Sequence, residues 1–155
     1  MEVFELVKIY LCILVILTIT GLTGCTHSNN ISVEDISIDT DIDSYAPSMS
    51  STVGIGLSPI CEYNGPSGSI KYHWYTDNGH FIAWDPPDFK VKRLGAEYIN
   101  NGQKIYWSYN PVEMDSERPS IEITLTVEDS QLGHILAETS LKFEWEDQHT
   151  VIVRK

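Results

Sequence analysis

Strict alternation of apolar and polar residues between Ile121 and Glu128 constrains the fold of this chain more than any other feature. The apolar set is Ile121, Ile123, Leu125 and Val127, and the polar set is Glu122, Thr124, Thr126 and Glu128. Successive side chains of a β-strand point to opposite faces, so this period of two predicts a strand with one buried and one solvated face. Such a strand is typical of an antiparallel sheet that is covered on one side only.

Shorter alternating or apolar segments indicate further strands along the chain. We expect them at 52–57, 69–76, 80–84, 104–109, 136–146 and 151–153. Turn signals lie between them, in Asp77-Asn78-Gly79, in Asn100-Asn101-Gly102 and at 129–133, because Asn and Gly tolerate positive φ. Beyond the N-terminal segment, no window has the period of an amphipathic helix. About seven short strands within residues 50–155 therefore predict an all-β fold, an antiparallel β-sandwich.

The N-terminal segment carries an apolar run from Ile9 to Ile19, which follows Lys8. The run is shorter than a membrane-spanning helix requires and suits the core of a signal peptide. Small residues come next and end in the tetrad Leu22-Thr23-Gly24-Cys25, which resembles the lipobox of bacterial lipoproteins. The resemblance implies cleavage before Cys25 and attachment of fatty acyl chains at Cys25, which anchor the protein to a membrane. A short membrane helix or an ordinary secretory signal is the alternative interpretation.

These features divide the chain into a signal peptide (1–24), an acidic tether (25–49) and a sandwich domain (50–155). Isoleucines 36, 38 and 42 of the tether alternate with polar residues, so we expect that part of it can pair as a first strand. Cleavage would remove Cys12 and acylation would occupy Cys25, which leaves Cys61 without a disulfide partner. The fold is therefore expected to depend on its hydrophobic core.

The charge balance excludes one class of partner. Acidic residues number 22 against 10 basic ones, and the net charge is −12. A nucleic-acid binder needs a basic stripe that neutralises phosphates, and this sequence offers none.

One stretch of the predicted domain is similar to a known family. The segment YHWYTDNGHF, from Tyr72 to Phe81, resembles the Tyr-x-Trp…Gly-x-Phe stretch of PKD-type immunoglobulin-like domains. Ile105-Tyr106-Trp107 and residues 121–130 are similar to later strands of that group, although Leu132 is inserted before the Gly133 of the turn. The resemblance covers residues 50–146 and implies an immunoglobulin-like sandwich that acts as an extracellular spacer or recognition module, without catalytic residues.

Aromatic side chains on the predicted outer faces are the candidate binding residues. Tyr75, Tyr106 and His73 point away from the predicted core, and Trp84 precedes the loop that begins at Asp85-Pro86-Pro87. Aromatic residues are enriched at interfaces. If neighbouring strands bring these four residues together, we expect a face that binds a sugar ring or a protein partner. The three other tryptophans fall on apolar faces and are expected in the core: Trp74, Trp107 and Trp145.

No constellation of metal ligands or catalytic groups stands out. Asp39, Asp41 and Asp43 alternate as in a calcium loop, but Ser44 and Ser50 stand where an EF-hand requires Gly and Glu, so they are only a weak candidate metal site. The five histidines lack zinc-site spacing, and no Gly-x-Ser-x-Gly elbow is present. We therefore expect neither enzymatic activity nor a cofactor.

The sequence thus favours a lipid-anchored, non-catalytic module of the cell surface or periplasm that binds a protein or glycan partner. The alternative is an immunoglobulin-like protease inhibitor that inserts loops 64–68 and 118–120 into a protease cleft. These loops resemble those of chagasin-type cysteine protease inhibitors, although the Asn-Pro-Thr-Thr-Gly motif of that family is not met. The sequence leaves open whether the anchor lies in an inner or an outer membrane.

Overall fold

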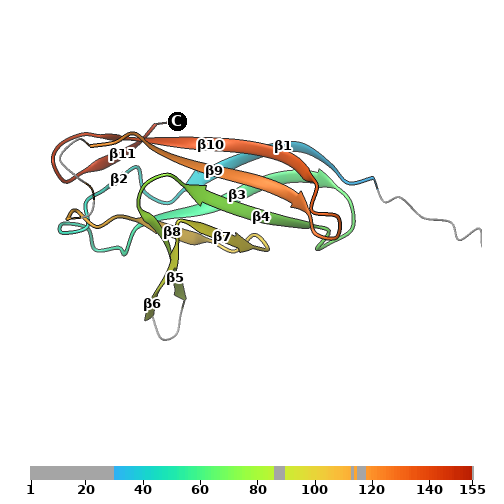
Figure 1. Ribbon diagram of the computed structural model, residues 1–155, viewed down its shortest axis with the longest axis horizontal. Coiled ribbons are helices and arrows are strands. Elements are labelled where there is room, and N and C mark those ends of the chain that lie inside the picture. Colours follow the sequence, from blue (N-terminus) through green and yellow to red (C-terminus); the bar gives the residue numbers. More distant parts are fainter. Residues whose placement is uncertain (1–29, 86–89, 113, 115–117, 155) are drawn as a thin grey trace, which may run out of the picture.

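The computed structural model describes residues 30–85, 90–112, 114 and 118–154. Within these residues the chain forms eleven strands, and the strand pairings are antiparallel. The strands are β1 (Ser32–Thr40), β2 (Ser44–Tyr45), β3 (Ile55–Asn64), β4 (Ile70–Thr76), β5 (His80–Asp85), β6 (Lys90–Gly95), β7 (Glu97–Asn100), β8 (Ile105–Ser108), β9 (Ile121–Asp129), β10 (Ile135–Trp145) and β11 (Val151–Arg154). They form two sheets around a common core (Figure 1). The predicted all-β, antiparallel, sandwich-like fold is confirmed.

One sheet contains five strands in the order β1-β3-β8-β5-β6, and the other contains six in the order β2-β11-β10-β9-β4-β7. β9 lies inside the six-stranded sheet, between β10 and β4. Its apolar residues Ile121, Ile123, Leu125 and Val127 are fully buried, whereas Glu122, Thr124 and Glu128 are partly exposed. The strand predicted from the alternation is therefore confirmed, and its apolar face is the one that meets the other sheet.

Two tryptophans from opposite sheets occupy the middle of the core. Trp74 on β4 and Trp107 on β8 are both completely buried. Trp74 packs edge-on against Phe81, and Trp107 packs edge-on against Phe143 with ring centroids 4.8 Å apart. The Trp107 indole N–H is satisfied inside the core, because it donates to the Asn78 carbonyl at 2.9 Å and lies 3.1 Å from Thr76 Oγ1. Both tryptophans are thus in the core, as predicted.

The structure differs from the sequence-based expectation in the number and position of strands. The prediction for 25–49 is a tether that can include a first strand. β1, which contains Ile36 and Ile38, is that strand, and β2 is a second strand that the sequence did not indicate. β1 pairs with β3 over its whole length, and its isoleucines pack against the core. Tyr45 of β2 is buried, and its hydroxyl bonds with Ser108 and with the Val53 carbonyl, both at 3.0 Å. The two sheets therefore include strands from residues 32–45, because apolar residues among the acids of this segment complete the core.

Two of the three predicted turns connect strands of different sheets. The turn at 77–79 links β4 to β5, and the turn at 101–104 links β7 to β8. Gly79 and Gly102 have positive φ, as the turn signals predict. A Cβ atom on Gly79 would lie 2.7 Å from the Trp107 ring and from the Ser108 carbonyl oxygen. Only glycine therefore allows this turn to cross closely over the core tryptophan.

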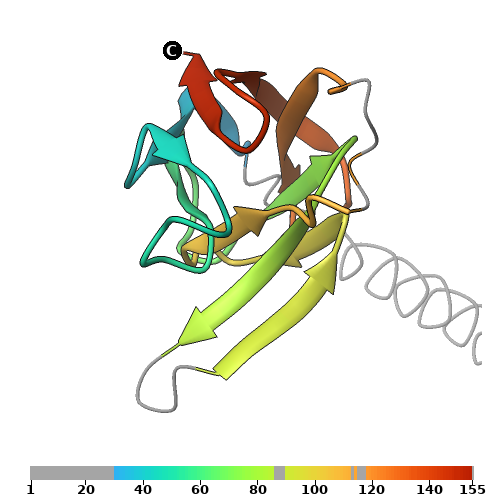
Figure 2. The same cartoon turned by 90° about the vertical axis from the view of Figure 1, so that its left-hand side faces the viewer.

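One hairpin extends beyond the sandwich. β5 pairs with β8 only over His80–Ile82 and then continues with β6, which forms the edge of the five-stranded sheet. Figures 1 and 2 both show the β5–β6 hairpin projecting away from the two sheets. In the part of the chain that the structure describes, no helix has the length and apolar character needed to cross a membrane.

The two ends of the sandwich carry different loops. At the end where β1 begins, called here the proximal end, the Ile31 side chain lies against Gly65, and Ser130 N–H donates to the Ser69 carbonyl at 2.8 Å. The proximal end therefore consists of the start of β1, the loop at 65–69 and the β9–β10 turn. The opposite, distal end carries the turn at 77–79 and the connections that precede β9 and β11. Figure 1 shows the proximal end on the right, and Figure 2 looks onto the distal end.

Candidate functional site

The four residues predicted to form one aromatic face lie on two different sheets. Trp84 on β5 and Tyr106 on β8 belong to the five-stranded sheet, whereas His73 and Tyr75 on β4 belong to the six-stranded sheet. His73 and Tyr75 alternate along β4 with the buried Tyr72, Trp74 and Thr76, so they occupy the outer surface of their sheet. The structure therefore brings these residues together in two pairs and not in a single face.

Trp84 and Tyr106 form a contact on the outer side of the five-stranded sheet. Their rings meet edge to face, with centroids 5.5 Å apart at 74°. Lys104 Nζ lies 5.2 Å from the Tyr106 ring centroid and 2.6 Å from Asp41 Oδ2. The hydrogen bond to Asp41 is the main reason why the pKa of Lys104 is raised above its ordinary value. This pair therefore presents a half-buried aromatic surface beside one ion-paired ammonium group.

His73 holds three strands of the six-stranded sheet together. Its Nδ1 lies 2.9 Å from a Glu128 carboxylate oxygen on β9, and its Nε2 lies 2.6 Å from a Glu97 oxygen on β7. Partial burial lowers the pKa of His73, but the two carboxylates raise it by more, so the net pKa is above its ordinary value. Because both ring nitrogens are engaged, His73 is a structural cross-link, and Tyr75, 51% exposed, is the accessible aromatic residue of this surface.

The acidic segment around Asp41 has a structural role. Asp41 Oδ1 accepts the Gly56 N–H at 2.7 Å, and Oδ2 pairs with Lys104. A Cβ atom on Gly56 would collide with both of those side chains. Among the described residues, no group of three or more His, Cys, Asp or Glu is arranged to hold a metal ion, so Asp39, Asp41 and Asp43 are not brought together as ligands.

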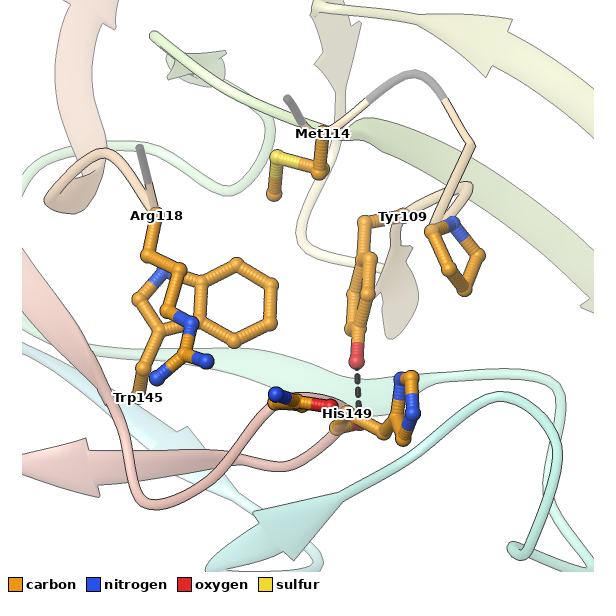
Figure 3. A pocket seen from close by; sticks show the side chains of 7 residues that line it. Tyr109, Met114, Arg118, Trp145 and His149 are labelled. Atoms are coloured by element: carbon orange, nitrogen blue, oxygen red, sulfur yellow. Dashed lines mark hydrogen bonds between the residues drawn. The ribbon is translucent and has the colours of Figure 1, made fainter. Parts of the chain in front are cut away.

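A pocket of about 300 Å³ opens at the distal end of the sandwich. Its lining comes from the segment after β8, from the residues before β9, and from the end of β10 with the turn that follows. The lining residues are Tyr109, Pro111, Met114, Arg118, Trp145, Gln148 and His149. Figure 3 shows Trp145 and Arg118 on one side, Tyr109 on the other, Met114 above and His149 below. This volume is at the lower end of the range of ligand pockets, so it suits one sugar ring or one amino-acid side chain.

The aromatic walls of the pocket are held by the core and by backbone carbonyls. The Tyr109 ring meets Trp145 edge-on at 5.2 Å and lies 5.7 Å from Trp107. Its hydroxyl donates to the His149 carbonyl, and burial raises the pKa of Tyr109 to about 12. The Trp145 indole N–H donates to the Pro119 carbonyl at 3.0 Å. These contacts fix both rings before any ligand arrives, which lowers the entropic cost of binding.

The turn that carries Gln148 and His149 into the pocket is polar and similarly fixed. Asp147 accepts hydrogen bonds from the backbone N–H groups of His149 and Thr150, both at 2.7 Å, and these bonds hold the pKa of Asp147 below its ordinary value. Arg118 has a φ of 47°, a left-handed backbone conformation that residues other than Gly, Asn and Asp rarely adopt. The pocket therefore combines one rigid pair of contacting aromatic rings, Tyr109 and Trp145, with the guanidinium group of Arg118 and the exposed side chains of Gln148 and His149.

Sequence reasoning did not identify this pocket. Trp145 was expected in the core, yet it is only partly buried, because it is the last residue of β10 and the sheet ends there. The usable signal was a tryptophan at a strand end followed directly by the polar turn Glu146-Asp147-Gln148. Tyr109 and Arg118 carry no comparable signal, since only the pairing of distant strands brings them to Trp145.

The two loops of the inhibitor hypothesis lie at opposite ends of the sandwich. Residues 64–68 precede β4, whose Ile70 pairs with Asp129, the last residue of β9. Residues 118–120 precede Ile121, the first residue of β9. The length of β9 therefore separates the two loops, which is about 27 Å for nine residues. A single protease cleft cannot receive both loops.

Comparison with known proteins does not add a relative. A scan against protein-family models, a search of curated proteins and a search of solved structures each returned no match.

Proposed function

We propose that this chain is a lipid-anchored, non-catalytic recognition module, held outside the cytoplasm by acylated Cys25, that binds a glycan or protein partner in the distal pocket. The observation that carries the proposal is the position of this pocket at the end of the sandwich opposite the start of β1. A chain anchored at Cys25 reaches the domain through the proximal end. The distal pocket then faces away from the membrane, toward whatever the protein meets outside.

The order of strands supports an immunoglobulin-like, PKD-like domain as the scaffold. In chain order, β1, β3, β4, β5, β8, β9 and β10 correspond to the seven strands A to G of such a sandwich. The order β1-β3-β8-β5 matches the sheet A-B-E-D, and β4-β9-β10 matches the sheet C-F-G. Buried Trp74 on β4 matches the core tryptophan of strand C. β2, β6, β7 and β11 are additions to that pattern.

The chemistry of the pocket favours recognition over catalysis. The partly exposed Trp145 ring offers an apolar surface that the buried Tyr109 ring supports, and the exposed polar groups around it orient a ligand. Asp147 is occupied by backbone N–H groups and keeps a lowered pKa, which opposes a role as a general acid near neutral pH. No observation favours the inhibitor alternative, because its two loops do not share an end.

The anchor is tested by mass spectrometry of the protein purified from bacterial membranes. Acylation of Cys25 predicts a mature chain that begins at Cys25 and carries fatty acyl mass. The matched control is Cys25→Ala, which should leave the chain uncleaved by the lipoprotein route and without acyl mass. An unmodified chain that begins at Met1 in the cytosol would refute the proposal.

The pocket is tested by binding to a glycan array and to extracted envelope proteins. Arg118→Asn keeps a residue that tolerates positive φ, Gln148→Ala truncates an exposed side chain, and neither change removes a core contact. We expect each to weaken binding of the identified ligand, by about tenfold where the side chain is an anchor. The matched controls are Tyr75→Ala, Trp84→Ala and Tyr106→Ala. Loss of binding in these controls alone would move the site to the outer faces, and unchanged binding in the pocket variants would refute the proposed pocket.

A further inference from the structure

Two large apolar side chains are exposed to solvent at the tip of the β9–β10 turn. Leu132 is 68% exposed and Ile135 is 67% exposed, although most apolar residues of β9 and β10 face the core. Residues 130–135 contain no Asp, Glu, Lys or Arg, whereas the chain as a whole has a net charge of −12. The tip is thus an apolar, carboxylate-free projection on an acidic domain.

The conformation of this tip is held by its own hydrogen bonds. Asp129 Oδ1 accepts the N–H groups of Gln131 at 2.7 Å and Leu132 at 2.9 Å. These bonds, that of Leu132 first, hold the pKa of Asp129 below its ordinary value. Gly133 turns the chain with a φ of 67°, and its N–H donates to the Asp129 carbonyl at 2.9 Å. Asp129 therefore directs its charge into the turn, and Leu132 is presented outward by a fixed backbone.

The tip lies at the end of the domain where the chain arrives from Cys25. Ser130 donates to the backbone of Ser69 and, through its hydroxyl, to the Gly68 carbonyl at 3.1 Å. In the same loop, a Cβ atom on Gly65 would lie 3.3 Å from the Ile31 side chain, so the loop also lies beside the residue that precedes β1. A continuous set of contacts thus joins the turn to the beginning of β1, and Figure 1 shows both at the right-hand end.

Covalent geometry limits how far this end can be from the anchor. Five peptide units separate Cys25 from Asn30, the first described residue, and they span at most about 18 Å when fully extended. The polar headgroup layer of one leaflet is about 5–8 Å thick. The proximal end of an acylated chain therefore stays within reach of the membrane surface at all times.

We infer that Leu132 and Ile135 insert into the lipid interface, so that the β9–β10 tip is a second membrane contact beside the acyl anchor. This inference rests on the acylation of Cys25 in the proposed function. The occupant is the bilayer, because burial of apolar side chains is favourable there and the nearest carboxylates already have partners, Asp129 in the backbone of the turn and Glu128 in His73. The exposed acids nearby, Glu34, Asp35 and Glu62, favour a zwitterionic over an anionic lipid surface. Two contacts would hold the sandwich upright and keep the distal pocket facing outward.

The test places an environment-sensitive dye at the tip of the acylated full chain in phosphatidylcholine vesicles. The dye is attached at Gln131→Cys in a Cys61→Ser background, and the matched control is Met49→Cys, an exposed position (82%) in the β2–β3 connection near the distal end. We expect a blue shift of the tip dye and several-fold stronger quenching by brominated lipid than at Met49→Cys. Because the dye itself has some affinity for lipid, the tip dye is also measured in Leu132→Ser/Ile135→Ser, where blue shift and quenching should be lost.

Each outcome decides between the explanations. An acylated, vesicle-bound protein whose tip dye behaves like the distal control overturns the inference and leaves the proposed function intact. Absence of acyl mass overturns both. A tip dye that is shielded without vesicles, and more so as protein concentration rises, shows that a second copy covers the tip and overturns the lipid contact. A blue shift that persists in Leu132→Ser/Ile135→Ser shows that the dye alone enters the lipid, and this result also overturns the inference.

Discussion

Replacing Gly79 with alanine should destabilise the domain far more than the same change at other glycines with positive φ. Gly79 has a φ of 82°, and its Cβ would lie 2.7 Å from two atoms of the Trp107 ring and from the Ser108 carbonyl oxygen. Ordinary contacts begin near 3.4 Å, so the ring or the turn must move by about 0.7 Å. Trp107 is completely buried between the sheets and has no free space to move into.

Two other glycines isolate the steric part of this cost. Gly133 and Gly68 have φ values of 67° and 77°, and nothing lies within 4 Å of their Cβ positions. Alanine at these sites destabilises the folded state by about 1–2 kcal/mol, because it must adopt a left-handed backbone conformation. Alanine also lowers the entropy of the unfolded chain, which offsets about 0.4–1 kcal/mol of this loss. Gly79→Ala adds the cost of overpacking, about 1–3 kcal/mol. We therefore expect its free energy of unfolding to be lower than that of Gly133→Ala or Gly68→Ala by about 1–3 kcal/mol.

Urea unfolding followed by tryptophan fluorescence measures these three free energies. The change should also reach the pocket, because Trp107 lies 5.7 Å from the Tyr109 ring that forms one wall. Gly79→Ala is thus expected to weaken ligand binding, whereas Gly133→Ala should not. Equal loss of stability in all three variants would refute the close crossing of the 77–79 turn over Trp107.

Three further predictions concern polar contacts. Because the pKa of His73 is raised in the folded state, the stability contributed by its carboxylate partners is fully present below about pH 6.5 and is lost as pH rises through the raised pKa. The wild type should therefore lose about 0.5 kcal/mol relative to His73→Gln between about pH 6 and 8 in urea titrations, and parallel curves would contradict this. Tyr109→Phe removes the hydroxyl that donates to the His149 carbonyl, so it should cost about 0.5–1.5 kcal/mol and speed hydrogen exchange in the turn after β10. Asp41→Ala leaves the Gly56 N–H without its acceptor and should lower the free energy of unfolding by about 1–3 kcal/mol. Lys104→Ala removes only an ion pair at the surface and should lower it by about 0–1 kcal/mol. A larger loss in Lys104→Ala than in Asp41→Ala would contradict the assigned bonds.

Local patterns predicted those parts of the fold that depend on one strand or one turn. The alternation of β9 indicated which side chains face the core, because the period of two reports the burial of one face directly. Buried Trp74 and Trp107 followed from their positions on apolar faces, and the positive φ of Gly79 and Gly102 followed from turn chemistry. The all-β, antiparallel architecture required no further information.

The candidate site could not be predicted in the same way. Periodicity shows that Tyr75 and Tyr106 face outward, but it does not show that β4 and β8 belong to different sheets, and this separation divides the expected face in two. Tyr109, Arg118 and Trp145 come together only because β8, β9 and β10 all have one end at the distal side of the sandwich.

The sequence by itself determined that the chain forms antiparallel strands with one apolar face, and it specified the lipobox-like tetrad that ends at Cys25. Tertiary structure alone decided which strands became neighbours, that β1 and β2 completed the sheets, and which loops gathered at each end. The physical reason is the distance along the sequence over which each feature is determined. Side-chain alternation and turn geometry are settled within a few residues, whereas the pairing of strands depends on how separate apolar faces fill one common core.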